Sequence, residues 1–196
     1  MTYLPTDDPI ALLLRYQAEA QALGVPLPEA MTLATVGADG APHARIVLFK
    51  GMRGRALTFF TNYESDKGRE LEANPRAALV FHFAAQERQV RVEGVVTKLS
   101  ASESDEYFAT RPRASQLGAW ASAQSRPLED RATLDRRFVA LSEEYRDRAV
   151  PRPAHWGGYA LEPGTIELWS GQVGRMHDRA RWVSRPGGWE FTLLQP

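Results

Sequence analysis

Many of the segments of this chain with strand character are joined by hairpins, and the helical segments are grouped rather than alternating with them. The strand-like segments are residues 31–36, 44–50, 55–61, 77–83, 89–99, 158–161, 165–170, 178–184 and 189–194. Asp39-Gly40 and Gly187-Gly188 are turn signals typical of hairpins, which join antiparallel strands. A doubly wound parallel sheet would need a helix between successive strands. The pattern therefore predicts a mainly β protein with helical attachments (α+β), built on an antiparallel barrel or sandwich.

Two short helices are expected outside the middle of the chain. Asp8 is a good N-cap and Pro9 suits the first helical position, so a helix is predicted over about residues 8–23. Ser65 is a cap for a second helix, which reaches about Ala73 before Asn74-Pro75 stops it.

Residues 101–148 have a helical pattern that breaks at Arg111-Pro112 and again at Ser125-Arg126-Pro127. Apolar residues recur there at helical spacing, which predicts one buried helix face, at Leu134, Phe138, Leu141 and Tyr145. No internal repeat or low-complexity tract divides the chain. The prediction is one domain, residues 1–196, with an N-terminal helix and a helical insertion at about 101–148.

Composition excludes several classes of function. The chain has no cysteine, which excludes disulfides, thiolate metal sites and a cysteine nucleophile. Its net charge is zero, which gives no reason to expect nucleic acid or an anionic membrane as a partner. No apolar stretch approaches the roughly 20 residues of a membrane-spanning helix. The acidic Asp7 and Asp8 precede a short apolar run, the wrong order for a signal peptide, so the cytoplasm is expected.

The histidines show no metal spacing, and we expect no metal. His82 is expected on a strand, and His43 and His155 in loops. The chain contains no nucleophile elbow, no H-E-x-x-H motif and no glycine-rich nucleotide loop. Hydrolase and metal chemistry therefore have no support, and a nucleotide-like ligand would have to be held in another way.

Clusters of cationic and hydroxyl side chains are the strongest functional signal. Arg45 and Lys50 flank one strand but face opposite sides of a regular strand, so they are either ligand-binding groups at its two ends or solvated cations. Thr61, Ser65 and Lys67 surround a predicted helix start, where free N–H groups favour anions. Simple helix capping is the alternative explanation for this second cluster.

Further clusters follow in the second half of the chain. Tyr107, Arg111 and Ser115 place a phenol, a guanidinium and a hydroxyl in one segment, which suits a phosphate group or an ordinary surface helix. Gln124-Ser125 precedes the predicted start of the long helix. Near the end of the chain, an aromatic residue and several potential cations suit a planar anionic ligand, or a charged strand edge, at Trp169, Arg175, His177 and Arg179.

Taken in order, these segments resemble the pyridoxamine 5'-phosphate oxidase family. The resemblance runs from about Asp8 to the C-terminus and rests on seven motifs in family order. They are Arg45-Ile-Val-Leu-Phe-Lys50, Glu87-Arg-Gln-Val90, Arg111-Pro-Arg-Ala-Ser-Gln116, Gly118-Ala-Trp120, Gln124-Ser125, Trp156-Gly-Gly158 and Arg175-Met-His-Asp-Arg179.

The resemblance implies an FMN-binding split β-barrel that works as a homodimer, with two active sites at the subunit interface. Residues expected to bind FMN are Arg45, Ile46, Val47, Leu48, Phe49, Lys50, Phe60, Thr61, Asp66, Lys67, Gln89, Gln124, Ser125, Trp169 and Arg179, of which some of the last four come from the partner chain. Residues expected to bind the substrate are Lys50, Tyr107, Arg111, Ser115, Arg175, Met176 and His177.

The implied activity is oxidation of pyridoxamine or pyridoxine 5'-phosphate to pyridoxal 5'-phosphate, by hydride transfer from C4' to the flavin. Oxygen then reoxidises the flavin and hydrogen peroxide is released. Arg175 and His177 are the expected catalytic residues, as orienting and charge-stabilising groups rather than as acid or base. Two alternatives stay open: a related oxidase of the phenazine-biosynthesis type, and a flavin-binding module without turnover.

The chain departs from the family pattern at two site positions. Asp66 occupies a position that usually carries an arginine directed at the flavin phosphate, and a carboxylate there would repel the phosphate. We therefore predict that Asp66 points to solvent or pairs with a neighbouring arginine, and that FMN binds more weakly than in relatives. Phe60 replaces a common tyrosine. The basic N-terminal segment that covers the substrate in relatives is also expected to be missing.

Overall fold

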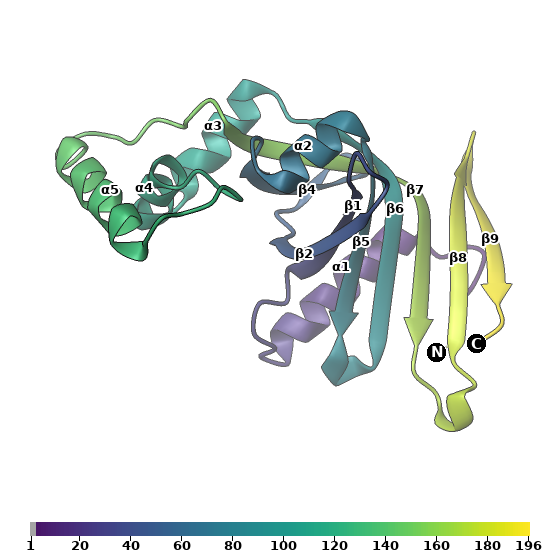
Figure 1. Cartoon of the computed structure of the whole chain (residues 1–196). Coiled ribbons are helices and arrows are strands. Elements are labelled where there is room, and N and C mark those ends of the chain that lie inside the picture. Colours follow the sequence, from purple (N-terminus) through teal and green to yellow (C-terminus); the bar gives the residue numbers. More distant parts are fainter. Residues whose placement is uncertain (1–2) are drawn as a thin grey trace.

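A computed structural model describes residues 3–196, and its central feature is one antiparallel sheet of nine strands (Figure 1). The strands are β1 (Ala30–Val36), β2 (Pro42–Leu48), β3 (Met52–Arg53), β4 (Ala56–Asn62), β5 (Arg76–Phe83), β6 (Arg88–Lys98), β7 (Trp156–Ser170), β8 (Asp178–Arg185) and β9 (Gly188–Leu194). The helices are α1 (Pro9–Ala22), α2 (Asp66–Ala73), α3 (Ala101–Thr110), α4 (Arg113–Ala121) and α5 (Arg131–Glu144), with short 3-10 turns η1 (Ala84–Gln86) and η2 (Val173–Arg175). The expected mainly β, antiparallel fold is confirmed.

The first part of the sheet closes into a barrel. Its strands are hydrogen-bonded in the order β2-β1-β5-β6-β7-β4-β3. The segment that follows β2 then returns to β4: the Lys50 N–H donates to the Thr58 carbonyl at 2.8 Å, and the Thr58 N–H donates to the Gly51 carbonyl at 2.9 Å. Because these bonds join the segment after β2 to β4, the strand next to the other end of the order, the sheet has no open edge at this point.

Strand β7 belongs to the barrel and also to an extension beyond it. Its first half pairs with β4 through residues 156–161, and its second half pairs with β8 through residues 165–170. The sequence predicts two strands here because Pro163 and Gly164 usually interrupt one. This prediction is wrong: Glu93 pairs with Thr165 and Gly94 with Pro163, so Gly164 is the extra residue of a bulge in β7, and the strand continues through it.

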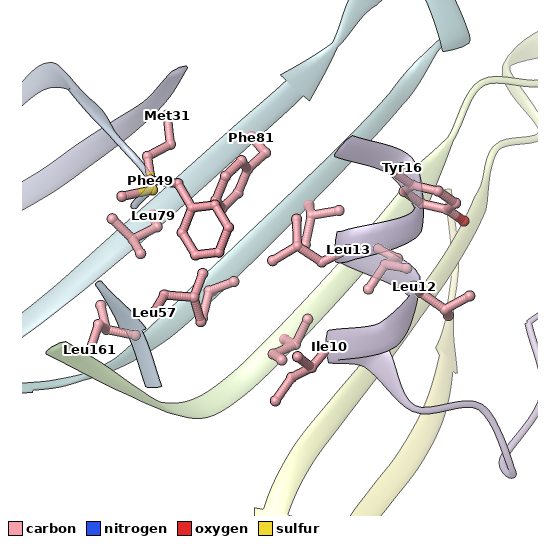
Figure 2. Close-up of a cluster of buried hydrophobic side chains, with 14 of the residues drawn as sticks. Ile10, Leu12, Leu13, Tyr16, Met31, Phe49, Leu57, Leu79, Phe81 and Leu161 are labelled. Atoms are coloured by element: carbon pink, nitrogen blue, oxygen red, sulfur yellow. The ribbon is translucent and has the colours of Figure 1, made fainter. Parts of the chain in front are cut away.

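The core fills the barrel and continues beneath α1. Figure 2 shows Leu13 of α1 on the side of Phe49 and Phe81, whereas the Tyr16 ring lies on the other side of the helix. These four side chains are all buried, and the Phe49 and Phe81 rings meet edge to face at 5.8 Å. Helix α1 begins as expected, since the Asp8 side chain accepts a hydrogen bond from the Ile10 N–H at 2.9 Å. This packing fixes the N-terminal helix against the barrel.

The helical insertion lies beside the barrel, at the left in Figure 1, and has a small core of its own. The expected face of α5 is only half-buried: Phe138 and Leu141 pack on this core, whereas Tyr145 alone of the face is fully buried. The predicted start of this helix is also wrong, because Asp130 caps α5 and Ser125 lies in the preceding loop at φ 67°. Among the described helices, none is long and apolar enough to cross a membrane.

Candidate active site

A pocket of about 660 Å³ lies between the barrel and the helical insertion. Strands β2 and β4, helix α2 and helices α3 and α4 all contribute to its walls. Its lining residues include eight of the predicted site residues, which we call the pocket group: Lys50, Phe60, Thr61, Lys67, Tyr107, Arg111, Ser115 and Gln124. Ile46, Val47 and Leu48 line it as well. The tertiary fold thus brings together polar side chains that are up to 74 residues apart in the sequence, from Lys50 to Gln124.

One wall of the pocket is a stack of parallel rings. Phe60 on β4 and Tyr107 on α3 lie with their ring centroids 3.8 Å apart and an interplanar angle of 17°. Trp156 at the start of β7 is nearly parallel to both rings, at 5.6 Å from Phe60 and 6.2 Å from Tyr107. Phe60 lacks a hydroxyl that would need a polar partner inside this stack. The aromatic wall fixes the position of Tyr107 relative to the barrel.

Arg111 lies at the junction of α3 and α4, above the ring of Trp156 at 4.4 Å. Its Nη1 atom is buried and has no hydrogen-bond partner among residues 3–196. Burial lowers the pKa of Arg111, and the nearby Tyr107 opposes this only in part. Buried guanidinium nitrogens are normally hydrogen-bonded, so the free Nη1 of Arg111 has the properties of an anion-binding group. Ser115, in the first turn of α4, adds a hydroxyl near a helix N-terminus.

Lys67 anchors another polar cluster, at the start of α2. Its Nζ donates to Ser65 Oγ at 3.2 Å and to Gln124 Oε1 at 3.3 Å, and Thr61 Oγ1 also donates to Gln124 Oε1 at 3.2 Å. Ser65 caps α2 as expected, because it accepts from the Gly68 N–H. Burial lowers the pKa of Lys67, and the positive charge of Arg45 lowers it further. An anion bound beside Lys67 would relieve this repulsion.

Arg45 is held behind the pocket by an acidic network. Its guanidinium donates to Glu70 Oε2 at 2.9 Å and also to the Thr35 hydroxyl. His43 Nδ1 lies 2.7 Å from Glu70 Oε1.

The sequence predicts His43 in a loop, and this prediction is wrong because His43 lies on β2. His82 lies on β5 and His155 lies in a turn, as expected.

Two predicted cofactor residues point away from the pocket. Asp66 forms an ion pair with Arg69 one turn along α2, and its side chain is 58% exposed. The prediction that Asp66 pairs with a neighbouring arginine is confirmed. Phe49 is 5% exposed and its ring lies in the barrel core, so its side chain is not available to a ligand.

The remaining predicted residues gather at the other end of β7, in what we call the turn group: Gln89, Trp169, Arg175, Met176, His177 and Arg179. Trp169 pairs in register with Gln89 on β6 and with Arg179 on β8. Arg179 donates to Glu167 Oε1 at 2.8 Å and to the Gln195 carbonyl at 2.9 Å. The three neighbouring strands β6, β7 and β8 thus place Gln89, Trp169 and Arg179 side by side, and the turn between β7 and β8 carries the other three residues of the group.

His177 and Arg175 lie in the turn between β7 and β8. The His177 ring lies 4.7 Å from the Trp169 ring, and His177 Nδ1 accepts a hydrogen bond from the Gln172 N–H at 3.2 Å. Because a backbone N–H can only donate, the neutral His177 ring carries its proton on Nε2. Arg175 adopts a left-handed backbone with φ 62°, a conformation that costs a residue with a side chain about 1 kcal/mol.

The pocket group and the turn group do not meet within one chain. Trp156 in the pocket and Trp169 in the turn group stand at opposite ends of β7, about 40 Å of extended strand apart. Figure 1 shows the same separation, with the insertion on one side and the β7–β8 turn at the far lower end. A complete site would therefore need a second copy of the chain.

Sequence reasoning gave no role to several residues that line the pocket or form ion pairs with the predicted site residues. Trp156 was part of a quoted motif, but only the tertiary structure shows that its ring stacks on Phe60 and lies under Arg111. Glu29 and Glu70 carried no local signal, since an isolated glutamate in a sequence looks like an ordinary solvated residue.

The fold and the site define an antiparallel β-barrel protein with a cationic, aromatic-walled pocket suited to an anionic ligand. A family model described as pyridoxamine 5'-phosphate oxidase matches residues 17–144, and a second, described as the pyridoxine 5'-phosphate oxidase C-terminal dimerisation region, matches residues 156–196. The chain belongs to the pyridoxamine 5'-phosphate oxidase family, which makes it a member of an oxidoreductase family.

Individual relatives agree with this assignment. The pyridoxine/pyridoxamine 5'-phosphate oxidase of Burkholderia multivorans is 55% identical over 192 residues, which cover 96% of this chain and 89% of that protein. The protein of the same name from Burkholderia lata is 53% identical with the same coverage. A solved structure of PhzG from Burkholderia lata, in complex with tetrahydrophenazine-1-carboxylic acid, has a TM-score of 0.92 at 33% identity and covers 98% of this chain and 94% of that chain.

Proposed function

We propose that this protein oxidises pyridoxamine or pyridoxine 5'-phosphate to pyridoxal 5'-phosphate, with FMN as its cofactor and oxygen as the electron acceptor. The observation that carries the proposal is Arg111, a buried cation without a hydrogen-bond partner for Nη1, in a pocket with Lys50, Tyr107 and Ser115. A phosphate ester offers several oxygens to such a set of donors.

The residues fit two anionic ligands. For FMN, the donors are Lys67, Thr61 and Gln124, which already contact one another, with Arg45 beside Lys67. For the substrate phosphate, the donors are those around Arg111. When bound, FMN supplies the two-electron acceptor for the hydride from C4' of the substrate and passes the electrons to oxygen, which gives hydrogen peroxide.

We propose a homodimer in which the turn group of one chain completes the pocket of its partner. The separation of the two groups along β7 supports this arrangement. The region that carries the turn group also matches the model described as a dimerisation region. In this arrangement Trp169 and Arg179 complete the FMN site, and Arg175, Met176 and His177 face the pyridine ring.

The chain's own contribution is position and charge. Arg111, Ser115, Tyr107 and Lys50 hold the phosphate, which fixes the distance of the pyridine ring from the flavin. His177 donates through Nε2 to a ring substituent, and Arg175 stabilises negative charge on the ring. The left-handed backbone of Arg175 presents this side chain in one orientation.

A related oxidase activity is the second candidate, because the PhzG structure matches over nearly the whole chain. Two observations favour the vitamin ester. The chain is 53% identical to the Burkholderia lata protein named pyridoxine/pyridoxamine 5'-phosphate oxidase but 33% identical to PhzG from the same species. A substrate without phosphate would also leave the Arg111 cluster poorly matched.

The test is anaerobic reduction of the purified protein loaded with FMN. Pyridoxine 5'-phosphate should bleach the yellow flavin absorbance, and air should restore it with release of hydrogen peroxide. Unphosphorylated pyridoxine is the matched control and should bleach it far more slowly. A protein that binds FMN and stays yellow with both phosphate esters would contradict the proposal.

A further inference from the structure

Glu29 is an acidic residue at the cationic end of the pocket. It lies directly before β1, and its backbone carbonyl accepts a hydrogen bond from the Phe49 N–H at 2.9 Å. This bond places Glu29 opposite the end of β2, where Lys50 follows Phe49. The Glu29 carboxylate lies 3.8 Å from Lys50 Nζ, and both side chains are 27% exposed.

The charge of Glu29 also reaches the other phosphate-binding candidates. Burial raises the pKa of Tyr107, Arg111 opposes this, and Glu29 raises the pKa further. Glu29 therefore acts on a group that lines the pocket, not only on Lys50. With Lys50 and Arg111 as cations and Glu29 as an anion, this end of the pocket has a net charge near +1 rather than +2.

We propose that Glu29 is an affinity-setting residue, which weakens the hold of the pocket on phosphate esters by competing for Lys50. A bound phosphate must draw Lys50 away from Glu29 and also tolerate a nearby carboxylate. The inference rests on the proposed function for the identity of the ligand. A weaker hold on the phosphate speeds release of the phosphorylated product, which carries the same ester as the substrate.

The opposite role is also physically reasonable and predicts the opposite result. Glu29 could orient Lys50 for the ligand, and its removal would then weaken phosphate binding. The sign of the change in affinity in Glu29→Gln therefore decides between competition and positioning. Glutamine keeps the size of the side chain, so the variant removes the charge and little else.

The experiment measures binding of inorganic phosphate and of pyridoxal 5'-phosphate to the FMN-loaded protein by calorimetry. Glu29→Gln should tighten both by about three- to tenfold at low ionic strength, with a smaller gain in 0.5 M salt, about where charges at this distance become screened. Glu72→Gln removes an exposed carboxylate of α2 that pairs with Lys98 on β6, and should leave both affinities unchanged. Glu29→Ala also removes the charge, and it tests whether the change in phosphate affinity depends on that charge. Melting temperatures verify that the variants are folded.

Anaerobic bleaching gives the kinetic counterpart. The concentration of pyridoxine 5'-phosphate at half-maximal rate should fall in Glu29→Gln, while the maximal rate of bleaching stays within about twofold of the wild-type rate, because only ground-state binding changes. Unchanged or weaker phosphate binding would overturn the inference even if the protein oxidises the ester. Tighter phosphate binding in a protein that oxidises neither ester would uphold the inference and refute the proposed function.

Discussion

Trp156 and Trp169 lie on one continuous strand, β7, and yet belong to different halves of the candidate active site. Trp156 stacks in the pocket between the barrel and the helical insertion, whereas Trp169 contacts His177 beside the β7–β8 turn. A rigid strand cannot bring its own two ends together. The same strand can, however, present its far end to the pocket of a second chain in a twofold dimer.

Mixed dimers test this arrangement. Arg111→Ala disables the pocket and Arg175→Ala disables the turn group, so each variant alone should lose most of its activity. After the two are unfolded together and refolded, about half of the dimers are mixed, and one of the two sites in each mixed dimer is intact. Activity should therefore recover to about one quarter of the wild-type value.

The control for the mixed dimers pairs two variants of the same half. Arg111→Ala and Ser115→Ala both alter the pocket, so every site in their mixed dimers carries one defect. No recovery is expected from this mixture. Recovery there, or its absence with Arg175→Ala, would show that the site is not shared between chains.

Asp66→Arg should increase the affinity for FMN. The Asp66 side chain pairs with Arg69 and leaves Lys67 and Arg45 as the nearby cations for the cofactor phosphate. An arginine at this position adds a charge-assisted hydrogen bond to the FMN phosphate. Because the position is exposed, solvent screening limits the gain in FMN affinity to about three- to tenfold. Quenching of flavin fluorescence measures the dissociation constant. Riboflavin, which lacks the phosphate, should bind both proteins equally, and an equal gain for riboflavin would point to a different cause.

Glu70→Gln should destabilise the protein in a way that depends on pH. Burial alone would raise the pKa of Glu70, but hydrogen bonds from Thr35, His43 and Arg45 outweigh it and lower the pKa. The carboxylate therefore contributes stability that is present above its unfolded pKa of about 4.3 and is lost as the pH falls through the folded value.

At pH 7 the variant should lose about 1–3 kcal/mol in free energy of unfolding, measured with urea, because a charge-assisted network is broken. The difference from the wild type should shrink as the pH falls below the unfolded pKa and through the lowered folded pKa, because Glu70 then becomes protonated in the wild type as well. Glu72→Gln, on the exposed side of the same helix, should stay within about 0.5 kcal/mol at every pH. A deficit in Glu70→Gln that persists at low pH would mean that packing, not charge, is responsible.

The neutral His177 ring should carry its proton on Nε2. The Gln172 N–H donates to Nδ1, which requires Nδ1 to be the acceptor. Nitrogen-15 NMR of the histidine rings, with the His177 signal identified by its absence in His177→Asn, distinguishes the two tautomers. His177→Phe, which keeps a ring but has no donor, should lower kcat/KM by about tenfold or more. A protonated Nδ1 would refute the assigned role of His177 as a donor through Nε2.

The sequence by itself determined the class of fold and the residue types of the site. Helices that are grouped rather than alternating with the strands, hairpin signals at Asp39-Gly40 and Gly187-Gly188, and caps at Asp8 and Ser65 can all be read from the sequence, and each one is present in the structure. Local signals failed where tertiary contacts outweigh them. Pro163 and Gly164 end a strand by propensity, but pairing with β6 on one side carries β7 through them.

Only the tertiary structure decided how the site residues are distributed. The sequence places Arg111, Trp156 and Arg175 in order along the chain, but it contains no measure of the distances between them. The length of β7 separates the pocket from the turn group, and the hydrogen bond from the Phe49 N–H to the Glu29 carbonyl sets Lys50 beside Glu29. These relationships come from non-local pairing, whose geometry depends on the whole sheet rather than on any neighbouring residues.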